Sequence, residues 1–400
     1  MVRFSFQHPA APLRLPRPLV PGDAIALVTP SRFADDATWE AAAAAIRAAG
    51  FTPVLPPAPS RPRDGSLGGS DAERAAALNA AFRDPSIRAV WALRGGYGAA
   101  RLLPLLDPAP FRADPTWIVG FSDITALHAW AAAQGVGALH ASVALTLDRV
   151  PPADRAALWT ALVAASPLEV AGVAGSEGAA APLEVAGVAG FEGAASPLEA
   201  AGVAGSEGAA APLEVAGVAG SEGAASPLEV AAPAFNYGTS NLDPESGAAA
   251  FSAAARRLDL ESGAAAFSAA ERRLCPVTGG NLSVLYSLLG TPWFPEVRGR
   301  WLFLEDLDEY MYHLDRMFCA FRLAGVFEEV AGVALGGFTE LHDHEVPFGR
   351  DLAGIVQDHV PEGVPVVWGV PAGHGDRNAP LVLGAPWEPE EYLRTHGNAR

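Results

Sequence analysis

A serine, a carboxylate and a histidine stand far apart in this chain, each in a context where its side chain could do chemistry. Ser122 follows an apolar run that ends at Gly120-Phe121, Glu305 follows another apolar run, and His374 lies between two glycines. A serine hydroxyl becomes a nucleophile when a base takes its proton and an acid orients that base. The three residues therefore predict a hydrolytic triad.

Ser122 is expected at a sharp turn between a strand over 117–121 and a helix over 123–134. At such a turn the N–H of the next residue and the helix N-terminus face the developing oxyanion. The second glycine of the Gly-x-Ser-x-Gly elbow is missing here. A second interpretation is therefore open, in which Ser122 or Asp123 only caps the helix.

The segment Arg94-Gly95-Gly96-Tyr97-Gly98 offers backbone N–H groups with no side chain in the way. Gly96 is the best placed of these to supply a second oxyanion donor. A tight turn before a helix is the alternative. A phosphate cradle is a third interpretation, and the absence of lysine and the net acidity weaken it.

Glu305 ends a strand, so its carboxylate can point into a cleft. Three further carboxylates follow closely, those of Asp306, Asp308 and Glu309. An exposed acidic loop is the alternative interpretation of this cluster.

The glycines beside His374 allow its ring an unusual direction, whereas a loop histidine bonded to backbone is the alternative. His342 and His344 could bind a metal weakly, but a pair without a distant third ligand is typical of a surface. His128 falls on the helix after Ser122 and is predicted to be a packing residue.

Alternating strands and helices predict an α/β fold. In the first part of the chain, a doubly wound parallel sheet covered on both faces is expected, and ligands collect at the carboxyl ends of its strands. The expected strands are 23–30, 51–55, 88–93 and 117–121, and the helices are 36–49, 70–83 and 123–134. Later in the chain, helices are expected at 279–289, 308–324 and 351–359, and strands at 301–304, 330–336 and 364–370.

Between these parts the chain is repetitive. A Pro-Leu-Glu unit recurs every 15 residues from Pro167, and a second tandem copy begins at Glu245 and again at Glu261. The units are poor in large apolar residues, so an expanded interdomain linker is favoured over a small stack of repeats. The predicted domains are 1–160, the linker at 161–274, and a smaller α/β domain at 275–400.

Composition excludes several classes of function. The net charge of −18 argues against nucleic acid as a partner. No apolar run approaches the ~20 residues of a membrane span, and the first residues lack a secretory signal, so a cytoplasmic protein is expected. Two cysteines give neither a disulfide framework nor a four-thiolate zinc site, and a chain without lysine has no Schiff-base amine.

The order of these motifs resembles the LD-carboxypeptidase family of serine peptidases, which also contains the microcin-C-immunity peptidases. The resemblance covers about 21–150 and 275–385. It is carried by Thr29-Pro30-Ser31, Arg94-Gly95-Gly96-Tyr97-Gly98, Gly120-Phe121-Ser122-Asp123, Gly279-Gly280-Asn281-Leu282, Leu304-Glu305-Asp306 and Gly373-His374.

The resemblance implies Ser122 as nucleophile, Glu305 as acid and His374 as base, with the backbone of Gly96 and Asp123 as oxyanion donors. It implies a nucleophile domain and a second domain that carries the acid and base, a homodimer, and no metal or other cofactor. The implied reaction removes the terminal D-alanine from a murein tetrapeptide. An arginine is expected to bind the substrate carboxylate, and Arg94 is the candidate.

Two other functions stay open. One keeps the triad and hydrolyses a peptidyl- or aminoacyl-nucleotide amide, and the other is a non-catalytic protein that binds murein peptides. The chain also departs from the family in two places. It has His140-Ala141-Ser142-Val143 where the family often has His-Gly-Pro-Met, and the segment from 166 to about 274 is longer than the usual connection.

Overall fold

The computed structural model describes residues 11–57, 61–164 and 275–397, which all belong to one compact unit. The repeats predicted between 166 and 274 lie outside the described residues. The domain bounds predicted from the sequence therefore stay predictions. No helix in the described part of the chain is long and apolar enough to cross a membrane.

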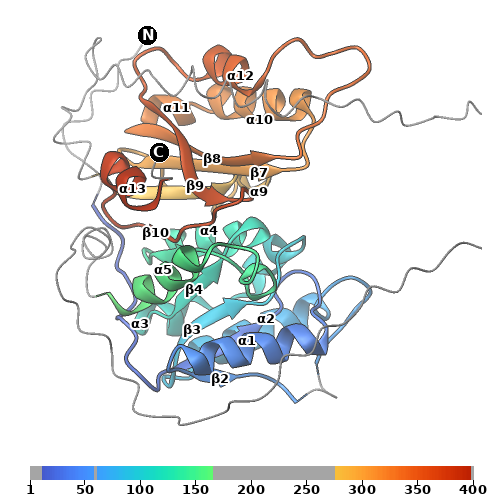
Figure 1. Cartoon of the computed structure of the whole chain (residues 1–400), viewed down its shortest axis with the longest axis vertical. Helices are drawn as coiled ribbons and strands as arrows, with labels where there is room; N and C mark the ends of the chain where they lie inside the picture. The colour runs from blue at the N-terminus through green and yellow to red at the C-terminus, as the bar shows by residue number, and fades with distance from the viewer. Residues whose placement is uncertain (1–10, 58–60, 165–274, 398–400) are drawn as a thin grey trace, which may run out of the picture. The chain divides into compact units, whose positions relative to one another are not determined.

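The first sheet has six strands in the order β10-β5-β4-β3-β1-β2. Figure 1 labels β10, β4, β3 and β2 of this sheet. They are β1 (Ala24–Val28), β2 (Thr52–Val54), β3 (Ile87–Ala92), β4 (Trp117–Gly120), β5 (Ala138–His140) and β10 (Leu381–Leu383). The first five pair in parallel, as predicted for β1 to β4, whereas β5 was not predicted and β10 pairs antiparallel with it. The sheet is thus mixed and mostly parallel, which corrects the expectation of a purely parallel one. The prediction missed β10 because a three-residue strand from the far end of the chain carries no periodic signal of its own.

Both faces of this sheet are covered, because alternate residues along each strand point to opposite sides. Ile25 and Leu27 pack with helices α1 (Asp36–Ala48) and α5 (Pro152–Val163). Ala26 and Val28 face the opposite core, which receives α2 (Asp71–Arg83), α3 (Pro108–Ala113) and α4 (Thr125–Ala133). The prediction of helices on both faces is confirmed. After β1 the chain continues to β2 on one side, and after β3 it continues to β4 on the other side. The strand order therefore reverses between β1 and β3, and α/β proteins bind ligands at such a point.

The second sheet is wholly parallel, with the order β6-β7-β8-β9. Its strands are β6 (Val277–Asn281), β7 (Trp301–Leu307), β8 (Gly332–Thr339) and β9 (Val366–Gly373). One face packs against α9 (Leu282–Leu288), α10 (Met311–Leu323), α11 (Val326–Glu329) and α12 (Leu352–His359). The other face packs against residues of β10 and α13 (Pro389–His396).

Gly279 and Gly280 lie in β6, although the sequence led us to expect them at the start of a helix. Both have positive φ, and a Cβ at Gly279 would lie 2.0 Å from the carbonyl oxygen of Phe303 on the neighbouring strand. A Cβ at Gly280 would lie 2.4 Å from Thr125 Oγ1. The glycines therefore let β6 approach its neighbours closely, and the helix begins after Asn281, whose side chain caps it.

Candidate active site

Ser122 lies directly after β4, as the first residue of a short 3₁₀ turn over Ser122–Ile124. Its φ of 63° is left-handed, a conformation that a residue with a side chain adopts at a cost. Gly120 is left without a side chain because a Cβ there would lie 2.8 Å from Ile124. A half-buried serine on a strained strand-to-helix turn is the geometry of a nucleophile elbow.

The glycine loop, residues 94–98 after β3, lies against Ser122. A Cβ at Gly95 would lie 3.1 Å from Ser122 Cβ and 3.2 Å from Ser122 Oγ. Gly96 follows with φ at 115° and is exposed. Within 11–57, 61–164 and 275–397, its N–H has no hydrogen-bond acceptor. The N–H of Gly96, one residue after Gly95, is therefore free to bind an oxyanion, which is the role predicted for it.

Glu305 and His374 are joined by a hydrogen bond. Glu305 lies on β7 with no exposed surface, and His374 follows the last residue of β9. His374 Nδ1 donates to Glu305 Oε2 over 2.5 Å. Gly373 permits this approach, because a Cβ there would lie 2.7 Å from Glu305 Oε2. The structure thus brings together the predicted acid and base.

Each member of this pair stabilises the charge of the other. Burial lowers the pKa of His374, but the charge and hydrogen bond of Glu305 outweigh burial and raise it above 6.5. Burial also raises the pKa of Glu305, but the interactions with His374 and His140 together outweigh burial and lower the pKa below 4.5. Glu305 therefore stays ionised and favours the imidazolium that would form when His374 takes a proton.

The neighbouring carboxylates are engaged elsewhere. Asp306 accepts hydrogen bonds from Asn281 Nδ2 and from the N–H of Ser283, both at 2.8 Å. Burial first, and then the charge of Glu305, raise the pKa of Asp306 to about 6. His342 Nε2 donates to Asp308 over 2.6 Å. Of the acids in this stretch, Glu305 is the one that reaches His374.

Glu309 accepts from His313 Nδ1 over 2.8 Å, so it too is committed away from His374. In the described part of the chain, no three His, Cys, Asp or Glu side chains are grouped so as to hold a metal ion.

The ring of His374 packs against the ring of Phe121, the residue before Ser122. The rings of Phe121 and His374 have centroids 4.8 Å apart. Among the described residues, the side chain of His374 is hydrogen bonded to Glu305, and no hydrogen bond joins it to Ser122 Oγ. The structure thus places His374 beside the serine turn, and the final contact of the triad stays a prediction.

The loop that contains His374 is bonded to the first half of the chain through Arg377 and Asn378. Asp154 on α5 accepts from Arg377 Nε over 2.8 Å and from the N–H of Asn378 over 3.1 Å. The Asn378 side chain in turn accepts from the N–H of Gly373 over 3.0 Å. This chain of bonds sets the position of the residue that precedes His374.

Asp123 has a second role that the sequence did not reveal. Its buried carboxylate accepts from Ser31 Oγ over 2.6 Å and from the N–H of Ala99 over 2.9 Å. Burial raises its pKa, although these bonds oppose the shift. The residue after the nucleophile therefore fixes the loops that follow β1 and β3, while its N–H stays the predicted oxyanion donor.

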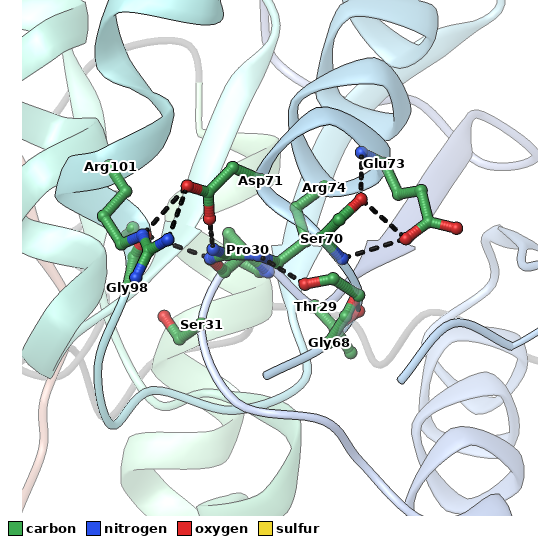
Figure 2. Close-up of polar contacts among 12 residues, drawn as sticks. Thr29, Pro30, Ser31, Gly68, Ser70, Asp71, Glu73, Arg74, Gly98 and Arg101 are labelled. Atoms are coloured by element: carbon green, nitrogen blue, oxygen red, sulfur yellow. Dashed lines mark hydrogen bonds and ion pairs between the residues drawn. The ribbon is translucent and has the colours of Figure 1, made fainter. Parts of the chain in front are cut away.

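Arg74 fixes the same two loops from α2 (Figure 2). Its buried guanidinium donates to the carbonyls of Pro30 and Gly98, and to Gly69 over 3.1 Å. Asp71 pairs with Arg74, and also with Arg101 over 2.8 Å. The sequence placed Arg74 on a helix but gave no sign of this role, since its partners are backbone carbonyls.

Two arginines lie near the glycine loop. Arg94, the predicted substrate-binding residue, is half-buried after β3. Arg94 lies near Asp35: the pKa of Asp35 is lowered mainly by hydrogen bonds from Thr38, and the charge of Arg94 lowers it further by a smaller amount. Arg32 was missed, and its exposed side chain lies against Gly96, where a Cβ would be 2.8 Å from Arg32 Cδ. Its place directly after Thr29-Pro30-Ser31 was the available signal.

His140 is the other residue that the sequence did not assign to the site. It was singled out only as part of a local departure from the family pattern. It is fully buried at the end of β5, with Nε2 4.0 Å from Glu305 Oε1. His128 is buried as predicted, on α4.

Comparison with known families gives two matches in chain order. Residues 25–141 match the LD-carboxypeptidase N-terminal domain, and residues 275–388 match the LD-carboxypeptidase C-terminal domain. The matches contain the serine turn in the first domain and both Glu305 and His374 in the second.

Individual proteins give the same picture. A putative carboxypeptidase of Synechocystis is 27% identical over 378 residues, which are 93% of each chain. A probable murein peptide carboxypeptidase of Bacillus subtilis is 24% identical over 380 residues, covering 92% of this chain and 89% of that protein. A solved structure of MccF in complex with glutamyl sulfamoyl guanosine has a TM-score of 0.59 at 19% identity, covering 92% of this chain and 93% of that one. That likeness shows a shared fold.

Proposed function

We propose a function for this chain, which belongs to the LD-carboxypeptidase family. It is a serine carboxypeptidase and removes the terminal D-amino acid from murein tetrapeptides. The observation that carries the proposal is the buried hydrogen bond between Glu305 and His374, next to the turn that bears Ser122. The acid–base pair and the turn of the strained serine lie at the ends of parallel strands, where α/β enzymes act.

In the proposed mechanism, Ser122 Oγ attacks the carbonyl carbon of the scissile amide while His374 takes the hydroxyl proton. The N–H groups of Gly96 and Asp123 stabilise the oxyanion. The tetrahedral intermediate then expels the amine of the terminal residue, which receives the proton from His374. Water hydrolyses the acyl-enzyme, with His374 again as base and Glu305 stabilising the imidazolium.

A carboxypeptidase must also recognise the free carboxylate of the residue that it removes. Guanidinium groups bind carboxylates through paired hydrogen bonds. Arg32 lies exposed against Gly96, and Arg94 begins the same loop. Both are candidates for this contact, and Arg32 has the more accessible side chain.

The test is a comparison of substrates with the purified chain. We expect release of D-alanine from a murein tetrapeptide, followed by mass spectrometry, and no release from the stereoisomer that ends in L-alanine. Turnover of an aminoacyl sulfamoyl adenylate in place of the tetrapeptide would support the microcin-type amide hydrolase instead. Tetrapeptide binding without turnover of either compound would support a non-catalytic binding protein.

The assembly and cellular location also stay predictions. We expect a homodimer, which light scattering after gel filtration would measure, and a cytoplasmic protein, which fractionation of cells would test.

A further inference from the structure

The structure surrounds the predicted acid with two histidines. Glu305 Oε2 accepts from His374, and Nε2 of His140 lies 4.0 Å from the other oxygen, Oε1. Glu305 and His140 are both without exposed surface. His140 ends β5 in the first sheet and lies opposite Gly120 in the register. It therefore links the strand of the acid to the strand of the nucleophile.

The facing polar atoms lack partners. Within the described ranges, Glu305 Oε1 and both ring nitrogens of His140 are buried without a hydrogen bond. A buried carboxylate oxygen without a donor is costly, and so is a buried N–H without an acceptor. The imidazole carries one N–H for which this oxygen is an acceptor, so one contact would satisfy an atom on each side chain.

Aromatic rings fix the direction of the imidazole. The ring of Phe303 meets His140 edge-on, with centroids 5.1 Å apart and planes inclined by 77°. Phe121 meets it in the same manner, with centroids 6.0 Å apart. The remaining ring beside it is that of His128, with centroids 6.3 Å apart, and both nitrogens of His128 also lack partners. Two phenyl rings thus hold His140 in a buried site next to Glu305.

We propose that His140 is a positioning residue for Glu305, in which Nε2–H donates to Oε1 and leaves Oε2 for His374. Closing the present distance to that of a hydrogen bond takes about 1 Å of movement by the two side chains. Held at both oxygens, the carboxylate cannot rotate away from His374, and its negative charge is stabilised. The inference rests on the proposed function, because it gives Glu305 the role of the acid.

Three variants test this role through the rate of reaction. His140→Phe keeps the ring and its contacts with Phe303 and Phe121 but removes the donor, and His140→Gln supplies an amide N–H. We expect His140→Phe to lower kcat about 10- to 100-fold, the effect of one hydrogen bond to a charged group, with KM changed less than about 2-fold. We expect His140→Gln to recover at least part of the loss. The matched control is His128→Phe, an equally buried histidine without a bond to Glu305, which should leave kcat unchanged.

The rate at which a fluorophosphonate labels Ser122 should fall in parallel with kcat. That measurement reports activation of the nucleophile without the substrate. Turnover by His140→Phe equal to that of the unmodified chain would overturn the proposal. So would a Gln variant as slow as the Phe variant, because shape and not donation would then be the cause.

A spectroscopic measurement on the unmodified chain does not depend on whether the variants fold. In ¹⁵N-resolved spectra of the imidazole rings, His140 should carry its proton on Nε2, and its N–H proton should be shifted downfield. Assignment follows from through-space contacts between the His140 ring and the rings of Phe303 and Phe121. A proton on Nδ1 alone would overturn the proposal. If the chain hydrolyses none of the substrates yet shows this proton, the proposed function fails while the contact stands.

Discussion

The imidazole of His374 packs on the phenyl ring of Phe121, with ring centroids 4.8 Å apart and planes inclined by 47°. Phe121 belongs to the turn that follows β4, whereas His374 follows β9 of the second sheet. The predicted base therefore takes its position from both halves of the described chain. Its acid comes from one half and the residue beside its nucleophile from the other.

Because Ser122 has a left-handed backbone, we expect two substitutions of this residue to abolish activity alike but to differ in their effect on stability. Ser122→Ala and Ser122→Gly should both lower kcat by about 10⁴-fold or more, because neither has a nucleophile. The glycine variant should be more stable than the alanine variant by about 1 kcal/mol, since glycine adopts positive φ without strain. Urea unfolding of the two proteins measures the difference.

The control for this pair is Ser287→Ala on the exposed side of α9, which should alter neither property. Substantial turnover by Ser122→Ala would remove Ser122 from the mechanism. An alanine variant more stable than the glycine variant would contradict the strain.

The raised pKa of His374 predicts the acid limb of the pH profile. His374 must be neutral to take a proton, so kcat/KM should rise with pH and level off only above the ordinary value of 6.5. In Glu305→Gln the negative charge is gone, so the pKa of His374 should fall and the limb should move to lower pH. The same variant should lose most of its turnover, because an amide does not stabilise the imidazolium. A limb that stays in place in Glu305→Gln would mean that another group titrates.

The parts of the fold that follow from local chemistry were predictable. Ser70 and Glu73 stand at the start of the predicted helix with the spacing of a capping box, and they form one: the Ser70 N–H donates to Glu73 over 2.9 Å and the Glu73 N–H donates to Ser70 over 3.3 Å. Gly50 follows the end of α1 with positive φ, as expected of a helix stop. Such signals lie within a few residues of the structure that they determine.

The parts that depend on distant neighbours were not predictable. The glycines of β6 signal a special backbone, but only Phe303 and Thr125 show that close approach is the reason. Asp123 was expected to act through its N–H, and its bond to Ser31 spans 92 positions in sequence. His140 had no helical or strand pattern to mark it as a neighbour of Glu305. Spacing along the chain therefore located the candidate triad but not the residues that hold it.

Arg32 predicts how the substrate carboxylate is recognised. Arg32→Gln should raise KM for a tetrapeptide about 10-fold or more, the loss of a charged hydrogen-bond pair, with a smaller effect on kcat. A tetrapeptide amidated at its C-terminus should be a poor substrate for the unmodified chain, and Arg32→Gln should no longer distinguish the two. Arg94→Gln, at the start of the same loop, is the matched comparison. If both variants keep the full preference for the free carboxylate, neither arginine makes this contact.

Arg74 predicts a stability effect that its neighbour Arg101 should not share. Arg74→Met leaves the carbonyls of Pro30 and Gly69 without this donor in a buried site, and leaves the Gly98 carbonyl with only the N–H of Arg101, which should cost about 3 kcal/mol of unfolding free energy. Asp71 keeps a partner in this variant, because Arg101 also binds it.

Arg101→Met removes a half-exposed ion pair to the same Asp71, and should lower the free energy of unfolding much less than Arg74→Met does. Urea unfolding compares the two variants. Since Arg74 fixes the loops on which Gly96 and Ser31 lie, we also expect Arg74→Met to lower kcat at temperatures where the protein is still folded. Equal stability of the two variants would show that Arg74 is not the anchor of these loops.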